Sequence, residues 1–240
     1  MSSLLSGAEF LGYNWQWVRI PRYLYTSGPD GFSAGPLLQG LGLTLQISSV
    51  SLLFSLLIGL LIALLRLSHS SVARWIAVIY LELIRNTQLL IQIFLIYFVV
   101  APILDIDRFA SAVLALSLFE GAYASEIIRA GILAIPKGQW EAAASLGMGR
   151  GQSYRYIVLP QALRQMAPPL TSQGVSLIKD SALVSTIAIY DLTMQGQQIV
   201  AETFLTFEVW FTVAAIYLVL TLGLSLLVRL LEWRLTGYQL

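Results

Sequence analysis

The stretch LLQGLGLTLQISSVSLLFSLLIGLLIALL, residues 37–65, contains no charged side chain. About 20 mainly apolar residues are enough for an α-helix to cross the hydrocarbon core of a bilayer. The stretch exceeds that length, so it predicts a membrane-spanning helix near the start of the chain.

The composition of the whole chain of 240 residues agrees with a membrane environment. Hydrophobic residues make up 57% and charged residues 11%, whereas soluble domains are roughly 25% charged. The mean hydropathy is +0.76. A net charge of +1 gives no basic field for nucleic acid. With no cysteine and only His69, disulfides, iron–sulfur clusters and multi-histidine metal sites are excluded, so no metal site is expected.

Four further apolar stretches bring the predicted number of spans to five, in an all-α integral membrane fold. They are Ile76–Val100, Phe109–Leu133, Leu170–Ile189 and Val209–Val228. Residues 1–36 are rich in Trp and Tyr but contain no spanning run and no signal-peptide pattern, which favours a periplasmic segment at the membrane interface. A transmembrane domain over 37–232 and a cytoplasmic tail over 233–240 complete the predicted organisation.

The lysines and arginines between the predicted spans set the orientation. The segments 1–36, 102–108 and 190–208 hold Arg19, Arg22 and Arg108. The opposite connections hold Arg66, Arg74, Arg129, Lys137, Arg150, Arg155, Arg164, Arg229 and Arg234. Basic residues accumulate on the cytoplasmic side. The amino terminus is therefore predicted outside and the carboxyl terminus inside.

The connection 134–169 is patterned rather than featureless. A short helix is expected over Gln139–Leu146, a turn over Gly147–Gly151, and a second helix from Ser153 that ends before Pro160. Pro168 and Pro169 are expected to open the next span. A solvated loop is the alternative, but it would expose several large apolar side chains together, so a docking surface is favoured.

This connection carries a resemblance to a known family. Glu141-Ala142-Ala143, Gly147 and Ile157-x-Leu159-Pro160 reproduce the pattern E-A-A-x3-G-x9-I-x-L-P. It is similar to the EAA loop of the membrane subunits of ABC importers. Flanking motifs resemble the polar amino acid importers: Gly40–Leu45, Glu82–Thr87, Gly121–Gly131, Leu146–Met148, Leu159–Arg164 and Lys179–Ser181.

Two positions depart from the family pattern. Gln88 stands where the family usually has proline, and Ser181-Ala182-Leu183 stands where it has Thr-Ser-Leu. Because proline bends a helix, the first departure is expected to change the bend of the second span.

The resemblance implies a permease subunit in the cytoplasmic membrane of a prokaryote, without catalytic activity of its own. Its expected partners are a second permease, identical or related, a dimer of ATPases, a soluble substrate-binding protein and an amino acid. No Walker A sequence occurs, so ATP and Mg²⁺ are expected on the ATPase and no cofactor on this chain. The expected ATPase-coupling residues are Glu141, Ala142, Ala143, Gly147, Leu159 and Pro160.

Polar residues inside apolar spans are costly and should face protein or a cavity. The predicted substrate pathway consists of Gln88, Gln92, Glu120, Tyr123, Gln173 and Ser176. The predicted structural charge pairs are Glu82–Arg85, Glu126–Arg129 and Lys179–Asp180. Glu120, near mid-span without a partner on its own helix, is expected to contact the substrate amino group beside Gln88 and Gln92.

Three functional alternatives remain. The segments Tyr13–Trp17 and Lys179–Ala182 resemble the glutamate/aspartate branch, which slightly favours acidic amino acids. A basic amino acid such as arginine is the second possibility, because Glu120 could pair with its side chain. An ion-coupled secondary transporter is least favoured, because such folds usually contain internal repeats and none is visible here.

Overall fold

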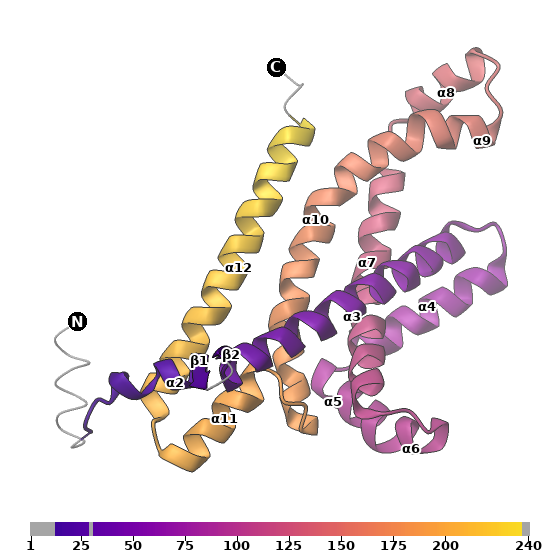
Figure 1. The fold of residues 1–240 in the computed structure, drawn as a ribbon. Coiled ribbons are helices and arrows are strands. Elements are labelled where there is room, and N and C mark those ends of the chain that lie inside the picture. The colour runs from indigo at the N-terminus through magenta and orange to yellow at the C-terminus, as the bar shows by residue number, and fades with distance from the viewer. Residues whose placement is uncertain (1–12, 29–30, 237–240) are drawn as a thin grey trace.

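The computed structural model describes residues 13–28 and 31–236, and most of them are helical (Figure 1). Within this part of the chain, three helices are long and apolar enough to cross a membrane. They are α3 (Pro36–Leu67), α7 (Arg108–Leu133) and α12 (Thr206–Thr236, apolar to Val228). The expectation of an all-α membrane protein is confirmed. The number of five spans and the orientation remain predictions.

The second predicted span is broken, so the prediction of one continuous helix is wrong. Helix α4 (Ser71–Arg85) ends, and the path turns by 104° before the segment Leu89–Leu104 begins. That segment consists of α5 (Leu89–Leu95), the π-helical η2 (Ile96–Val100) and α6 (Ala101–Leu104). The turn falls at Asn86–Gln88, so the bend occurs here without proline.

The fourth predicted span has different boundaries from those expected. Helix α10 runs from Leu159 to Asp180 and continues into the 3₁₀-helix η4 (Ser181–Ile187). Pro160 lies in the first turn of α10, directly after the π-helical segment Tyr154–Val158, and the helical path continues through it. Pro168 and Pro169 lie inside α10 rather than at the start of a span.

Helices α3 and α7 form the centre of the molecule (Figure 1). A Cβ added at Gly59 would lie 2.7 Å from the Cβ of Ala124, so the two backbones approach too closely for a larger residue. Small residues at a contact of this kind let membrane helices pack by dispersion forces. Ser117 also donates a hydrogen bond of 3.3 Å to the carbonyl oxygen of Ser51. These contacts hold α7, which carries the polar residues of the predicted pathway.

The segment before α3 packs on the start of α12. It contains η1 (Trp17–Arg19), α2 (Pro21–Leu24) and a hairpin of β1 (Tyr25–Gly28) with β2 (Gly31–Ala34). The backbone N–H of Gln16 donates a hydrogen bond of 2.6 Å to buried Glu208, and the Tyr13 hydroxyl bonds the same carboxylate. The expected position of the segment before α3 at the membrane interface remains a prediction.

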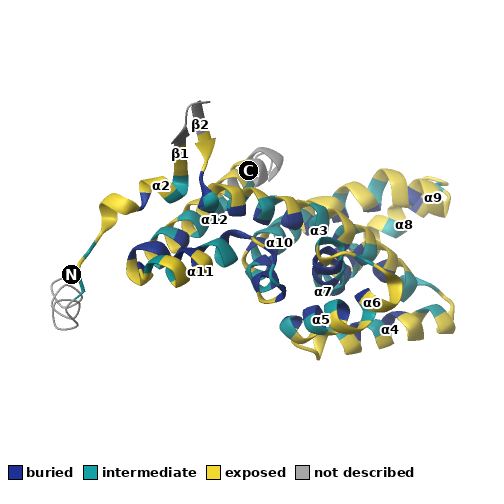
Figure 2. Ribbon diagram, turned by 60° about the horizontal axis from the view of Figure 1, so that its bottom comes forward, coloured by how far each residue is buried: buried dark blue, intermediate teal, exposed yellow. Residues whose placement is uncertain are grey.

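Helices α11 (Leu192–Thr203) and α12 form the opposite side of the molecule from α4 (Figure 1). Figure 2 shows a long exposed stretch on α4, and helix α12 also has few buried residues. Apolar side chains supply much of that exposure, for example Val219 at 72% and Trp75 at 67%. Surfaces of this kind fit contact with lipid or another membrane subunit rather than with water.

Candidate functional site

The connection between α7 and α10 forms a separate helical module (Figure 1). Helix α8 (Lys137–Ser145) is followed by a turn and by α9 (Arg150–Ser153), and the path then continues through the π-helical η3 (Tyr154–Val158) into α10. The expectation that this second helix stops at Pro160 is therefore wrong. The Trp140 and Tyr154 rings meet edge to face with centroids 4.8 Å apart, which joins the two arms of the module.

Gly147 makes the turn that ends α8. Its φ is +70°, a conformation that costs residues with a Cβ roughly 1–2 kcal/mol. In this conformation the Met148 N–H reaches the Ala143 carbonyl oxygen at 3.1 Å, and the Gly147 N–H reaches that of Ala144 at 2.9 Å. These bonds supply donors to carbonyl groups that would otherwise be unpaired at the end of the helix.

The expected coupling residues do not share one exposed face. Glu141, Ala142, Gly147, Leu159 and Pro160 are exposed, whereas Ala143 is fully buried. Leu146, which the sequence motif leaves variable, is 78% exposed and is the most prominent apolar side chain at the end of α8. A partner would therefore contact Ala142 and Leu146, while Ala143 holds α8 against the rest of the chain.

A second group of polar residues lies where α10 packs on α7. The Gln173 side-chain amide donates a hydrogen bond to Glu120, which is 1% exposed. The Asp180 carboxyl group lies near enough to Glu120 for the two groups to interact electrostatically. Two carboxyl groups at this separation repel unless a proton or a cation lies between them. Glu120 therefore has partners on a neighbouring helix, although one of its oxygens has no hydrogen-bond donor.

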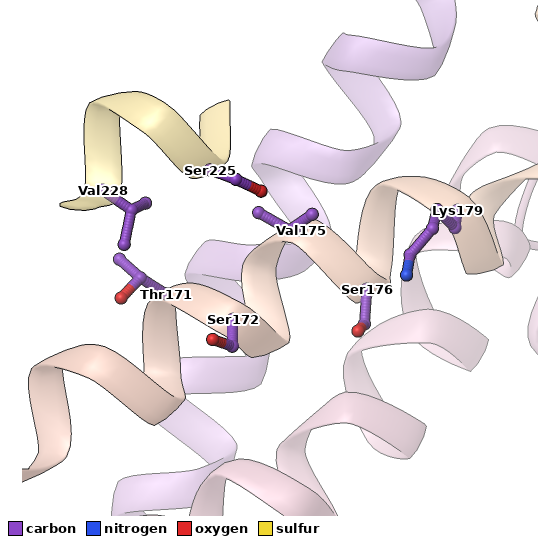
Figure 3. A pocket seen from close by; sticks show the side chains of 7 residues that line it. All are labelled: Thr171, Ser172, Val175, Ser176, Lys179, Ser225 and Val228. Atoms are coloured by element: carbon purple, nitrogen blue, oxygen red, sulfur yellow. The ribbon is translucent and has the colours of Figure 1, made fainter. Parts of the chain in front are cut away.

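A cavity of about 340 Å³ lies between α10 and α12 (Figure 3). Its lining contains four hydroxyl groups and one ammonium group: Thr171, Ser172, Ser176, Ser225 and Lys179 line it with Val175 and Val228. In Figure 3 the Lys179 and Ser176 side chains point to the same side of α10. Ser176 was predicted in the substrate pathway, and Lys179 in a structural pair with Asp180. The spacing of residues 172, 176 and 179 on one helical face was the signal that could have identified the cavity.

Three of the predicted pathway residues lie elsewhere. Gln92 is buried, and its side-chain amide donates to backbone carbonyls at the α4–α5 break. Gln88 is exposed at the start of α5. The Tyr123 ring lies 5.7 Å from the Arg85 guanidinium. The structure thus unites Glu120 with Gln173, but not with Gln88 or Gln92.

The charged residues at the other end of α7 form a three-helix cluster. Glu126 forms ion pairs with Arg66 of α3, with Arg85 of α4 at 3.6 Å and with Arg129 of its own helix at 3.1 Å. The expected pair Glu82–Arg85 does not form. Glu82 instead accepts a hydrogen bond of 2.7 Å from the Asn86 side chain, because the end of α4 directs Arg85 towards α7.

The residues around α10 include an ammonium group and carboxyl groups close together. Within residues 13–28 and 31–236, no group of three or more His, Cys, Asp and Glu could hold a metal ion. Lys179 and Asp180 are neighbours, so their side chains project about 100° apart around the helix. An ammonium group and a carboxylate group are thus offered on adjacent faces of one helical turn.

The model of the family described as "binding-protein-dependent transport system inner membrane component" matches residues 55–237. The glutamine transport system permease protein of Escherichia coli K12 is 41% identical over 201 residues, which cover 82% of this chain and 92% of that protein.

Two further relatives come from Bacillus subtilis 168. The L-cystine transport system permease protein is 40% identical over 206 residues, covering 85% of this chain and 88% of the relative. The arginine transport system permease protein is 38% identical over 201 residues, covering 83% and 92%.

Solved structures show the same similarity. A crystal structure of an amino acid ABC transporter with histidines matches with a TM-score of 0.78 and 40% identity over 83% of this chain and 94% of that chain. An inward-facing structure of a methionine ABC transporter matches with a TM-score of 0.72 at 20% identity, over 83% and 96%, which supports the fold alone.

Proposed function

The chain belongs to the family of inner membrane components of binding-protein-dependent transport systems, and on that premise we propose how it binds and moves its substrate. It is a permease subunit of an amino acid ABC importer in the inner membrane. It has no catalytic role, because a separate subunit hydrolyses ATP. An ATPase and a substrate-binding protein are its partners within the family.

In this proposal α8 docks the ATPase. The exposed Leu146 and Ala142 offer an apolar contact, and Gly147 fixes the direction in which α8 projects. ATP and Mg²⁺ bind the ATPase and no cofactor binds this chain. Two permeases, identical or related, pair in the membrane, and movement of α8 switches them between inward-open and outward-open packings.

The substrate is an amino acid held near the last turn of α10. Lys179 and the surrounding hydroxyl groups bind its carboxylate in the cavity of about 340 Å³. The carboxyl groups of Glu120 and Asp180 do not line this cavity, and in this proposal they bind the substrate ammonium group from the adjacent side of α10, which faces α7. A cavity of this size lies at the small end of ligand pockets, which fits a molecule as small as an amino acid. The observation that carries the proposal is this placement of opposite charges on neighbouring faces of one turn.

The charges of the site also bear on the choice of substrate. Two carboxyl groups against one ammonium group disfavour an acidic side chain and favour an uncharged polar or a basic one. The acidic preference expected from the sequence is therefore replaced, in this proposal, by glutamine-like or arginine-like substrates. The names of the relatives, which include glutamine, cystine and arginine, support polar amino acids as a class.

The experiment is amino acid uptake by the complex reconstituted in vesicles with its ATPase and binding protein. Glu120→Gln and Lys179→Met should each lower uptake and substrate-stimulated ATP hydrolysis by at least about tenfold, a loss of roughly 1.4 kcal/mol of binding per charge. Basal hydrolysis and subunit assembly should persist. Arg74→Gln, which changes an exposed arginine on α4, is the matched control.

Competition between substrates tests the class. Unlabelled glutamine and arginine should reduce uptake more strongly than glutamate does. Uptake by Glu120→Gln at the wild-type rate would assign Glu120 a purely structural role through Gln173. Stronger competition by glutamate would restore the acidic preference.

A further inference from the structure

The ion cluster at the α8 end of the transmembrane helices contains more positive than negative charge. Three arginines from three helices surround one carboxylate, that of Glu126. Glu126 pairs with Arg66 and Arg129 through short contacts, whereas Arg85 lies at 3.6 Å. One negative charge cannot neutralise three guanidinium groups, so the cluster carries an excess of two positive charges.

The cluster is open to an additional ligand. The side chains of Arg66, Arg129 and Arg85 are 23%, 30% and 46% exposed, so each retains donors that Glu126 does not occupy. Glu82, the nearest acidic residue along α4, is engaged by Asn86 instead. A guanidinium group presents five donors in a planar fork, and this geometry fits the oxygens of a phosphate group.

The position of the cluster indicates which anions can reach it. Arg66 lies one residue before the end of α3, and Arg129 lies in the last turns of α7, which leads directly into the α8 module. Arg85 ends α4, next to the break. Basic pockets between transmembrane helices on the cytoplasmic side bind the headgroups of anionic lipids.

We propose that Arg66, Arg85 and Arg129 form a binding site for the phosphate group of an anionic lipid, such as phosphatidylglycerol, in the leaflet on the α8 side. Glu126 holds the three arginines in place and leaves two of their charges for the headgroup. A bound lipid would tie α4 to α3 and α7, because the arginines come from these three helices. This site is distinct from the amino acid site proposed on α10.

The test measures anionic lipid bound to the purified full-length permease in phosphatidylcholine nanodiscs containing increasing phosphatidylglycerol. Arg85→Gln should weaken phosphatidylglycerol binding roughly fivefold, the effect expected for one arginine near an anionic headgroup. Arg74→Gln, which removes an exposed arginine outside the cluster on the same helix, should leave binding unchanged. Wild-type binding by Arg85→Gln would overturn the proposal.

The Glu126→Gln variant distinguishes a lipid-binding site from a cluster that only joins the helices. Loss of the carboxylate frees a third positive charge, so the affinity for phosphatidylglycerol should rise roughly fivefold. The thermal stability of this variant should fall in phosphatidylcholine and recover when phosphatidylglycerol is added. A stability loss that phosphatidylglycerol does not reverse, with unchanged binding, would show that the cluster only joins helices.

Inorganic phosphate distinguishes the source of the anion. A lipid site requires that millimolar phosphate in solution does not displace phosphatidylglycerol from the wild-type protein. Displacement at that concentration would assign the cluster to a soluble phosphate and overturn the lipid proposal.

Discussion

The side-chain amide of Gln92 donates a hydrogen bond of 2.7 Å to the carbonyl oxygen of Ile84, across the break between α4 and α5. The same amide donates to the carbonyl oxygen of Thr87 at 3.0 Å. Carbonyl groups at the end of a helix have no partner within it, and in an apolar environment they are costly when left open. Gln92 therefore stabilises the 104° bend that replaces a straight second span.

Gln92→Leu should destabilise the permease by about 1–3 kcal/mol, because the carbonyls of Ile84 and Thr87 lose the Gln92 amide and Ile84 keeps a long backbone bond of 3.4 Å from the Thr87 N–H. The measurement is the thermal unfolding midpoint of the purified protein in detergent. Gln197→Leu on exposed α11 is the matched control and should change the midpoint little. Equal midpoints for Gln92→Leu and wild type would show that lipid or water serves these carbonyls.

Gln88→Pro should be tolerated and should stabilise the protein by about 0.4–1 kcal/mol. Gln88 has φ −65° and ψ 138°, and proline fixes φ near this value. None of the described hydrogen bonds at the break uses the Gln88 N–H as donor. Proline would thus lower the entropy of the unfolded chain without straining the fold. Distances between spin labels on α4 and α6 should match those of the wild type, and a straightened segment would refute this reasoning.

The contrast between α3 and α4 shows which parts of the fold the sequence determines. Long apolar runs predicted α3 and α7 to within a few residues and the start of α12 to within three, because length and apolarity suffice for a helix in lipid, although α12 continues to Thr236, beyond the predicted end at Val228. The second span is also apolar, but its composition gives no sign of the break, because side-chain hydrogen bonds satisfy the carbonyl groups that the break exposes. Helix α10 was misplaced because Pro168 and Pro169 are tolerated inside it.

The same break explains the error in the predicted site. Placing Gln88 and Gln92 beside Glu120 assumed an unbroken second helix, and the 104° turn between α4 and α5 removes that relation. Glu120 and Gln173, by contrast, each lie in a continuous helix, and the sequence assigned both to one pathway. Lys179 was missed because it was paired with its neighbour Asp180, although its spacing from Ser172 and Ser176 places all three on one face of α10; that α12 closes the cavity over this face is a tertiary contact that the sequence does not show.

Substitutions at Gly147 should separate backbone strain from steric conflict at the coupling loop. No atom lies within 4 Å of a Cβ built there, so the permease itself has room for a side chain. The φ of +70° is strained for valine but acceptable for asparagine. Gly147→Val should therefore lower the stability of the turn by about 1–2 kcal/mol, and Gly147→Asn by much less.

Co-purification of the ATPase with these variants measures docking. Gly147→Asp should insert in the membrane but retain less ATPase than Gly147→Asn, because it adds a charge at the proposed contact. Full retention with Gly147→Asp would place Gly147 outside the docking surface.

Single cysteines test the predicted orientation, because the chain contains no cysteine of its own. Arg150→Cys, at the exposed start of α9, should react with a membrane-impermeant maleimide only after the cells are opened. Leu104→Cys, 61% exposed at the end of α6, should react on intact cells. The reverse labelling pattern would invert the orientation, and labelling of both on one side would change the number of spans.

Asp191 supplies a pH-dependent element outside the membrane-spanning helices. It is fully buried and begins α11, where its carboxylate accepts a hydrogen bond of 2.9 Å from the Met194 N–H. Burial raises the pKa of Asp191 from 3.8 to about 6, against the effect of the backbone hydrogen bonds. Because the folded pKa lies above the unfolded one, the stabilising contribution is complete below about pH 4 and is lost as the pH rises through 6.

Asp191→Asn should therefore stabilise the permease above pH 6, by at most about 3 kcal/mol for a difference of roughly two pKa units. Asparagine caps a helix as well as aspartate does but carries no charge to bury. Asp191→Ala removes the charge and the cap together, so its gain should be smaller by about 1 kcal/mol. Unfolding midpoints measured from pH 4 to 8 should decline for the wild type between pH 4 and 6 and stay flatter for Asp191→Asn. A parallel decline in both proteins would assign the pH dependence to another group.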